Sequence, residues 1–435
     1  MSLKSLLSKL LMLALTVVKS CEFDGDDLIV SVRPRKSRLC RCPHCGRKAP
    51  VHDVPSDPRR WRALDLGQTK VYLEYRLPRV KCGECGVHAA GVPWARPVSR
   101  FTRDFEDQVA WLAVNCSKSA VSELMRIDWH TVGGICGRVY GDLEESAGDS
   151  RFDGLVRIGI DETSYKKGHR YMTVVVNHDT SAVVWCAKGY GKEVLRSFFL
   201  QLSDGQRASI RVFTADGAKW ISEVLEELCP EAERVMDPFH VVSWMTDALD
   251  EVRKVAWREA RKEEKAAEEN APKRGRGRPR KGEEKPESKA DAIKGSRYSL
   301  LKNPEDLTES QAIKLERVAR ENKPLYRAYL LKERLRDVFK AKDADTAKGL
   351  LEGWLKSACH SANAKIRELS KKVRRHKGAI IRAVELGVSN ARIEATNNKI
   401  KVIIRMAYGF RNIDNLIALV MLKCSRIPVR LPGRV

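Results

Sequence analysis

The sequence has little that would place it in or across a membrane. Its N-terminal apolar run, Leu10–Val18, is nine residues long, whereas a helix that spans a bilayer needs about 20. Lys4 and Lys9 before the run are typical of a signal peptide, but Lys19 stands where small residues precede a cleavage site. We therefore expect a short buried helix that leads into a strand at residues 28–32, and no membrane partner.

The chain also lacks a disulfide framework and an excess of acidic residues. Eight of its twelve cysteines are isolated or nearly so. The other four form two Cys-x-x-Cys pairs, which in a reducing compartment favour metal binding over a disulfide. Lys and Arg number 81 against 57 Asp and Glu, which gives a formal net charge of +24. A charge of this size favours a polyanionic partner, nucleic acid or an anionic membrane surface, and says nothing about fold.

The two cysteine pairs predict a zinc site. Each pair is followed by glycine, a pattern typical of a knuckle whose turn points both sulfurs inward, and two knuckles complete a tetrahedral Zn²⁺ site. The predicted ligands are Cys42, Cys45, Cys82 and Cys85. Alternating apolar residues at 71–77 indicate a hairpin between the pairs. Redox-active dithiols are the alternative, and four side chains stay open as substitute ligands: Cys40, His44, His52 and His88.

Basic and aromatic residues at 59–62 lie between the two cysteine pairs. We predict a loop here whose arginines, Arg59, Arg60 and Arg62, contact DNA phosphates. An ordinary exposed basic turn is the alternative.

Residues 100–145 have the rhythm of three short helices. Ser117 is a plausible cap of the second helix, and the third starts near His130 after a turn at Ile127-Asp128. This pattern is that of a helix-turn-helix DNA-binding unit, or of a generic three-helix packing unit. Gly133 and Gly134 weaken the third helix, since each costs about 1 kcal/mol relative to Ala.

Residues 156–240 predict an α/β unit in which two strands end on aspartate. The first is Val156–Asp161 and the second is Arg211–Asp216. Strands at 171–176 and 182–186 follow the first as an antiparallel meander. A helix from 192 to 202, a helix after Asp216 and a strand at 233–236 complete a mixed sheet with helices on its faces. Asp237 and His240 come at the same edge, where Asp237 is either the cap of a long helix or a support for the aspartates.

Composition changes sharply from Arg253 to Lys294, where Lys, Arg, Glu, Gly and Pro dominate. We expect a solvated linker that cannot bury a core. Its Arg276-Gly-Arg278-Pro stretch resembles an AT-hook, whose arginines lie in the minor groove of DNA, and a merely basic linker is the alternative. Helical patterns return over 296–375.

The helix after Ser389 places one carboxylate among amides and cations. Its polar residues recur at helical spacing and share one stripe: Glu394, Asn397, Asn398, Lys401 and Arg405. Such a stripe could hold a metal and then track a phosphate backbone. Gly409 is expected to cap the helix, and an ordinary amphipathic helix is the alternative. Three converging carboxylates, Asp161, Asp216 and Glu394, would repel one another without divalent cations, so they indicate a two-metal Mg²⁺-type site.

The ordered combination resembles bacterial insertion-sequence transposases of the DDE class, in the subgroup with an N-terminal zinc-binding domain. The matching motifs run in order along nearly the whole chain: the two Cys-x-x-Cys pairs, the three helices, Gly-Ile-Asp161-Glu, Ala-Asp216-Gly, Asp237-Pro-Phe-His240, Glu394-Ala-Thr-Asn-Asn-Lys and Tyr408-Gly-Phe-Arg. The resemblance implies an α/β ribonuclease H-like mixed sheet interrupted by an α-helical insertion. Glu162, beside Asp161, is a possible competitor for a ligand role.

The implied organisation has six segments. These are an N-terminal helix and strand (1–38), a zinc-binding domain (39–98), a helix-turn-helix domain (99–150), the first half of the catalytic domain (151–260), a basic linker with an α-helical insertion (261–375) and the second catalytic half (376–435). The resemblance also implies catalysis by the two aspartates and Glu394 with two Mg²⁺ or Mn²⁺ ions, support from Asp237, His240, Asn397 and Asn398, and a structural Zn²⁺.

The implied activity is cleavage of the ends of an insertion sequence and their transfer to target DNA. Its partners would be double-stranded DNA, as inverted-repeat ends and as target, and further copies of the chain in a synaptic homodimer or larger assembly. The protein would work in the bacterial cytoplasm, on the nucleoid. Two other functions stay open: a non-catalytic DNA-binding regulator, and a ribonuclease H-like nuclease that cuts without joining.

Overall fold

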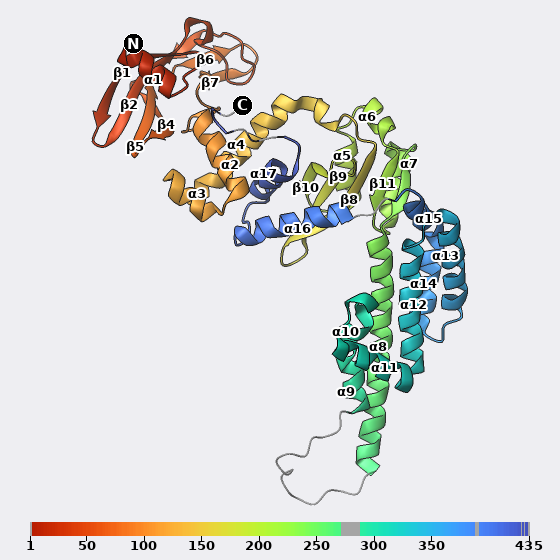
Figure 1. Ribbon diagram of the computed structural model, residues 1–435. Helices are drawn as coiled ribbons and strands as arrows, with labels where there is room; N and C mark the ends of the chain where they lie inside the picture. The colour runs from red at the N-terminus through yellow and green to blue at the C-terminus, as the bar shows by residue number, and fades with distance from the viewer. Residues whose placement is uncertain (1, 271–287, 388–390, 428, 430, 434–435) are drawn as a thin grey trace, which may run out of the picture.

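The computed structural model describes residues 2–270, 288–387, 391–427, 429 and 431–433. Figure 1 shows two small sheets at the N-terminal end, a group of helices next to them, a five-stranded sheet at the centre and a long helical arm that projects from it. Over the described ranges, no helix is both long enough and apolar enough to cross a membrane.

The N-terminal part is built on a four-stranded sheet of order β1-β2-β5-β4. Its elements are α1 (Leu3–Leu10), β1 (Thr16–Asp24), β2 (Asp27–Pro34), the 3-10 turn η1 (Lys36–Arg38), β4 (Arg59–Leu66) and β5 (Thr69–Tyr75). The expected hairpin is β4–β5. The buried helix expected over Leu10–Val18 is wrong, because α1 ends at Leu10 and the run continues into β1. The β-branched residues from Thr16 onwards favour a strand over a helix.

A second, three-stranded sheet carries the cysteine pairs. It consists of β3 (Val51–Asp53), β6 (Arg79–Cys82) and β7 (Gly86–Ala89), in the order β3-β6-β7. The second Cys-x-x-Cys turn therefore joins two paired strands, since Cys82 ends β6 opposite Gly86 at the start of β7.

The three predicted helices are α2 (Arg103–Asn115), α3 (Lys118–Met125) and α4 (Trp129–Ala147). Each begins at a polar cap, and Ser117 caps α3 as predicted, through a hydrogen bond from the Ala120 N–H. Gly133 does not interrupt α4. A Cβ there would lie 2.5 Å from Nδ2 of Asn415, so the glycine makes room for the C-terminal helix α17 (Ile413–Cys424).

A buried ion network holds the start of α2 against its neighbours. The Glu106 side chain is fully buried and accepts hydrogen bonds from Arg96, Ser99 and Arg138. Arg96, itself 5% exposed at its side chain, also pairs with Asp107 and Asp142. The network therefore links the segment after β7 to both α2 and α4.

Glu106→Ala should lower the free energy of unfolding of this junction. Removing one partner of a buried network leaves a charge without compensation, which costs about 3–5 kcal/mol of unfolding free energy. Glu123, exposed on α3, offers a matched control whose change to Ala should cost less than about 0.5 kcal/mol. Denaturant unfolding followed by circular dichroism measures both, and equal stabilities for the two variants would contradict the role of the network.

The central sheet has the order β10-β9-β8-β11-β12. Its strands are β8 (Arg157–Lys166), β9 (Arg170–Asn177), β10 (Ala182–Lys188), β11 (Val212–Ala215) and β12 (Glu233–Met236), and the nearby helices are η2 (Gly148–Phe152), α5 (Lys192–Phe199), α6 (Asp204–Ser209) and α7 (Lys219–Leu228). The first three strands form the expected antiparallel meander, and β11 lies parallel to both β8 and β12. The sheet is therefore mixed, as predicted.

Helices cover both faces of this sheet. Side chains of α5 and α7 form one core with Ile158, Ile160 and Phe213. The other face packs on α2, α4, α17 and α16 (Ala391–Met406), so that Val174 and Val176 of β9 share a core with Ile393 of α16. The C-terminal helices thus join the helix-turn-helix segment to the sheet.

The arm contains α8 (Pro238–Asn270), α9 (Lys289–Gly295), α10 (Arg297–Leu301), η3 (Pro304–Asp306), α11 (Glu309–Glu321), α12 (Lys323–Phe339), α13 (Ala344–Cys359), α14 (Ala364–Arg375) and α15 (Lys377–Glu385). It has its own core around the fully buried Trp354. The linker expected from Arg253 is wrong as far as Asn270 and again from Lys289, because α8 continues and buries Ala260, and α9 buries Ile293. Alternating Glu and Lys on one side, with alanine on the other, suit a long helix as well as a solvated chain.

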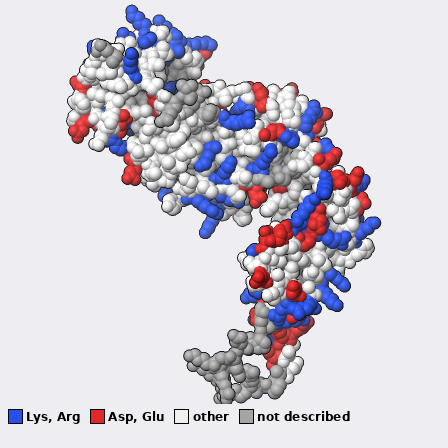
Figure 2. Space-filling model, in the orientation of Figure 1, with Lys and Arg blue, Asp and Glu red and all other residues white. Residues whose placement is uncertain are grey.

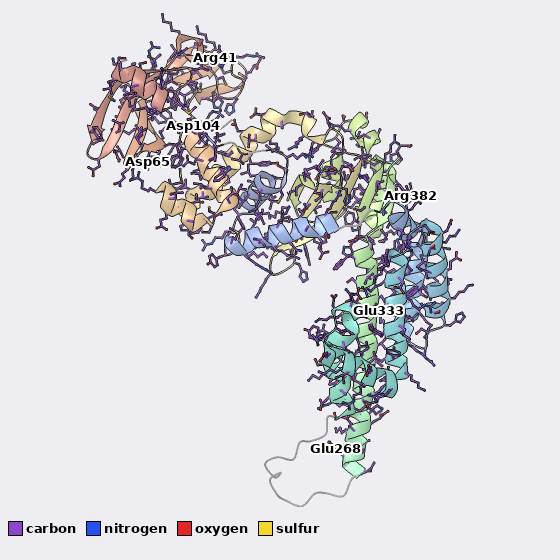
Figure 3. All side chains as sticks on the ribbon, in the orientation of Figure 1. Arg41, Asp65, Asp104, Glu268, Glu333 and Arg382 are labelled. Atoms are coloured by element: carbon purple, nitrogen blue, oxygen red, sulfur yellow. The ribbon has the colours of Figure 1, made fainter. Side chains whose placement is uncertain are left out.

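The arm returns to the sheet at α15. Arg382 of α15, which Figure 3 labels, donates to Glu233 of β12 at 2.7 Å. Ala383 packs in a small core with Val212 and Val235. The insertion therefore starts and ends at the β12 edge of the sheet.

Candidate active site and zinc centre

The four predicted cysteines meet in space. One sulfur atom from each of Cys42, Cys45, Cys82 and Cys85 lies within 4.8 Å of all the others. The Cys45 and Cys82 sulfurs are 3.6 Å apart, close to the separation of about 3.8 Å that a tetrahedral Zn–S₄ centre requires. All twelve cysteines are among the residues that the structure describes, and none of them forms a disulfide. The donor set therefore fits a structural zinc ion.

The neighbouring candidates do not join this quartet. Within the described ranges, the only group of three or more potential ligand atoms that lie this close together is the four cysteines. His44 and His88 instead pack against each other, with ring centroids 4.5 Å apart. Backbone N–H groups of Cys85 and Glu84 lower the pKa of the Cys82 thiol to about 7, whereas burial raises the pKa of the Cys85 thiol to about 12.

Asp161 lies in the middle of β8. The expectation that the strand ends there is wrong, since β8 continues to Lys166 as one half of a hairpin with β9. The parallel pairing with β11, however, ends at Gly159 opposite Thr214. Asp161 is therefore just beyond the point where β8 and β11 separate. Asp216 directly follows the end of β11, so the two aspartates lie at the same edge of the parallel strands.

Gly159 allows α16 to lie against β8. A Cβ at this position would overlap Ile393 Cδ1 and Thr214 Oγ1 and would come within 2.6 Å of His178 Nε2. Ile393 is fully buried there. The glycine of the Gly-Ile-Asp motif is thus the residue that lets the helix approach the strand.

Gly159→Ala should displace α16 and lower DNA cleavage at least tenfold, because a shift of about 1 Å in an active site costs about 10²-fold. Gly137→Ala is the control, since nothing lies within 4 Å of a Cβ on that glycine of α4. A gel assay of end cleavage measures the first effect, and binding to the same DNA should be unchanged. Full cleavage by the Gly159 variant would show that the close approach is dispensable.

Asn397 connects α16 to the first aspartate. Its Nδ2 group donates to Asp161 Oδ2 at 2.6 Å across 236 residues of sequence. Its Oδ1 atom is buried and has no hydrogen-bond partner among the described residues. A buried acceptor without a partner is costly, so this amide oxygen is suited to a donor or a cation beside Asp161.

Negative charge gathers around Asp161. Burial raises the pKa of its carboxyl group, and the nearby Asp216 raises it further, while the Glu162 N–H and His240 oppose the shift. Asp216 follows β11 and is fixed by the turn, because its Oδ1 accepts from the Ala218 N–H at 2.9 Å. Arg234 donates to the backbone carbonyls of Asp216 and Ala218.

Gly217 brings Asp216 close to the start of the arm. A Cβ on Gly217 would lie 2.6 Å from the Trp244 ring of α8. The Lys372 ammonium group lies 3.5 Å from the centroid of the same ring. The arm therefore shapes the outer wall of the site.

Glu394 lies one helical turn before Asn397 on α16 and is exposed. It is outside any close cluster with the two aspartates, because the cysteine quartet is the only such group in the described parts of the chain. Glu394 does, however, lie on the helix whose Asn397 side chain donates a hydrogen bond to Asp161. The start of the helix expected at Ser389 lies outside the described residues.

Glu162, predicted only as a possible competitor for a ligand role, has a strongly raised pKa. Burial and the charges of Asp216 and Asp161 raise the pKa of its carboxyl group to about 7, and the Gly191 N–H opposes this. The feature of the sequence that pointed to Glu162 is its position directly after Asp161. Three carboxyl groups, those of Asp161, Glu162 and Asp216, thus interact electrostatically at this edge of the sheet.

Asp237 has the predicted capping role. Its Oδ1 accepts from the Phe239 N–H at 3.0 Å, with Pro238 as the first residue of α8. It is also buried, and its Oδ2 is 3.7 Å from Nε2 of His240. Since His240 interacts electrostatically with Asp161, the cap also orients a group that faces the site.

Basic side chains continue along α16 away from the aspartates. Lys401 and Arg405 are exposed on this helix, as is Asn398. Figure 2 shows several Lys and Arg side chains on the face over α16. This face is therefore positively charged next to an acidic site.

The arginines between the cysteine pairs lie in strand β4, so the expected loop is wrong. Arg62 is 5% exposed and pairs with Asp65, which Figure 3 labels and which also pairs with Arg126. Arg60 pairs with Asp24 and Glu74, and Arg59 donates to the Ser99 carbonyl at 2.6 Å. Arg62 is therefore a buried, paired side chain and not the exposed loop arginine that was expected. Arg276 and Arg278 lie outside the described residues.

Comparison with known families matches three successive segments of the chain. Residues 38–85 match a zinc finger of the transposases of IS204, IS1001, IS1096 and IS1165. Residues 92–140 match the helix-turn-helix domain of transposase family ISL3, and residues 158–420 match the DDE transposase of that family. The chain belongs to the ISL3 family of transposases.

Curated relatives of this ISL3-family chain are similar over nearly their whole length. It is 47% identical over 431 residues to the transposase for insertion sequence element IS1557 of Mycobacterium tuberculosis (strain H37Rv), which covers 96% of this chain and 95% of the relative. It is 26% identical over 394 residues to the transposase for IS1001 of Bordetella parapertussis, with 90% of each chain covered.

The predicted class is therefore confirmed: the protein is a DDE-type DNA transposase with a zinc ribbon and a helix-turn-helix before its catalytic domain. A DDE domain implies a divalent metal, and the helix-turn-helix implies DNA binding. The alternative of a non-catalytic regulator leaves the DDE domain unexplained.

Proposed function

We propose that Asp161, Asp216 and Glu394 are the catalytic carboxylates and bind two Mg²⁺ or Mn²⁺ ions. The observation that carries the assignment is the hydrogen bond from Asn397 to Asp161, which fixes the helix of Glu394 against the strand of the first aspartate. Burial and, to a smaller extent, the charge of Asp216 raise the pKa of the Asp161 carboxyl group, and a bound cation would offset both effects. The fold that this arrangement fits is ribonuclease H-like.

The chain's own residues hold and orient the site. The Asn397 amide fixes the Asp161 carboxylate and leaves a buried oxygen free for a further partner. The Ala218 N–H fixes Asp216, and Asp237 orients His240. Bound divalent ions would supply activation of a water and stabilisation of the leaving 3′ oxygen.

The proposed reaction is cleavage at the ends of the insertion sequence followed by joining of the freed 3′-OH to target DNA. Lys401 and Arg405 would contact phosphates next to the site, and the zinc ribbon and helix-turn-helix would bind the inverted-repeat ends. Because two ends have to be brought together, the active form would be a homodimer or larger. The protein would act in the cytoplasm, on the nucleoid.

The test is incubation of the full chain with Mg²⁺, a labelled element end and a target plasmid. Cleaved ends together with joined product support the proposal, whereas cleaved ends alone identify a nuclease without joining activity. Glu394→Gln should remove both products and leave end binding intact. Glu368→Gln, at an exposed glutamate of α14, is the matched control and should behave as wild type.

A further inference from the structure

An open cleft lies where the helix-turn-helix, the β8–β9 hairpin and the α16–α17 turn meet. Its volume is about 640 Å³, within the range of about 300–1,000 Å³ of sites that hold small ligands. Three cations line it, Lys118, Lys166 and Arg411, and none of its described lining residues is Asp or Glu. The cleft therefore favours an anionic occupant.

Two aromatic rings on opposite elements of this cleft are exposed. Tyr408, between α16 and α17, is 97% exposed, and Trp129, the first residue of α4, is 49% exposed. Tyr408 also has a left-handed backbone, with φ at 51°. A left-handed tyrosine is strained, and strain of this kind is kept at functional sites. The predicted cap Gly409 is left-handed too, so the turn holds the tyrosine out while the glycine completes it.

The cleft is connected to the proposed active site by two elements. Along α16, Met406 at the cleft is nine residues after Asn397, a rise of about 13 Å in an α-helix. Along β8, Tyr165 at the cleft is four residues after Asp161, about 13 Å in a strand. Figure 1 shows the C-terminal end of α16 beside the β8–β9 loop. Lys401 and Arg405 lie on α16 along this path.

We propose that this cleft binds an unpaired base of the DNA strand that the active site processes, with Tyr408 and Trp129 as stacking rings. The inference rests on the proposed function. Bases in a duplex are stacked on each other and present only their edges, so exposed rings can stack only on bases that are out of the helix or at an end. Lys118, held 4.5 Å from the Phe410 ring centroid, and Arg411 contact the phosphates that flank this base.

The test compares two fluorescent DNA probes with the full chain in the absence of divalent cations. One probe is single-stranded octathymidylate and the other is a blunt 30-base-pair duplex, with anisotropy as the readout. Tyr408→Ala and Trp129→Ala should each weaken single-strand binding about 5- to 100-fold, the effect of losing one stacked base. Tyr408→Phe keeps the ring and should bind as wild type, and duplex binding should change less than about twofold in both Tyr408 variants.

The control is Tyr298→Ala, at a tyrosine of α10 that is 64% exposed on the arm. It should bind both probes as wild type. Unchanged single-strand binding by Tyr408→Ala, or an equal loss for both probes, would overturn the proposal. So would a change in sedimentation to a smaller species without loss of single-strand binding, since that would identify the cleft as a contact between copies.

Failure of this inference is distinguishable from failure of the catalytic assignment. Loss of single-strand binding by Tyr408→Ala supports the cleft whatever Asp216→Asn does to cleavage, because the binding assay needs no cation at the carboxylates. A Tyr408→Ala variant that binds the single strand normally but has lost cleavage would overturn the cleft alone. Circular dichroism of each variant confirms that the exposed substitutions leave the fold intact.

Discussion

Asp216→Asn should reduce end cleavage by on the order of 10³-fold or more, as expected when a residue that acts within one catalytic unit is lost. The change keeps the size of the side chain and its ability to accept from the Ala218 N–H. It removes one negative charge from the edge that Asp161 and Glu162 share. A gel assay with a labelled element end and Mg²⁺ measures the loss.

Binding of the same DNA should be unchanged in this variant, because the helix-turn-helix is a separate segment. Asp204→Asn is the matched control. Asp204 is 96% exposed at its side chain, lies on α6 and pairs only with Arg207 of the same helix among the described contacts. Cleavage at the wild-type rate by the Asp216 variant would remove that residue from the catalytic set.

The double change Cys42→Ser and Cys82→Ser should abolish zinc binding and unfold the three-stranded sheet that carries the cysteines. Zinc content should fall from one ion per chain to less than about 0.1, since a structural zinc site binds and folds together. Loss of the sheet should weaken binding to the element end. Atomic absorption measures the metal, and limited proteolysis of residues 39–98 measures the folding.

Cys40→Ser provides the control for this experiment. Cys40 is two residues before the first ligand, yet it is outside the quartet. It should keep one zinc ion and wild-type resistance to protease. Loss of zinc in the Cys40 variant, or retention in the double variant, would show that the ligand set differs from the four sulfurs that meet in the structure.

Local signals in the sequence were sufficient for the parts of this protein that are stabilised by short-range chemistry. The Cys-x-x-Cys-Gly turns fix their own geometry, so the zinc ligands could be predicted from spacing. Ser117 and the helical periodicity after it located α3, and the strand Glu233–Met236 was predicted to the residue. Gly-Ile-Asp161 and Ala-Asp216-Gly pointed to one edge of the sheet.

Tertiary context decided the parts that the sequence did not reveal. The pattern around Asp161 did not show that β8 continues to Lys166, because the hairpin partner β9 and not local propensity extends it. Arg62 reads as a surface arginine, but the pair with Asp65 makes its burial possible. The polar composition after Arg253 is typical of a linker, but α8 continues through this stretch because α9 packs against it. The position of α16 depends on Gly159, which packs against Ile393, a residue 234 positions later in the sequence.

The contact from Asn397 to Asp161 has a consequence for synthesis on the ribosome. The zinc ribbon forms its own core from residues 7–95, whereas Asn397 follows Asp161 by 236 residues. At about 5–20 residues per second, translation of that interval takes about 12–47 s. A nascent or prematurely terminated chain would therefore hold a folded zinc ribbon before the contact between α16 and β8 can form.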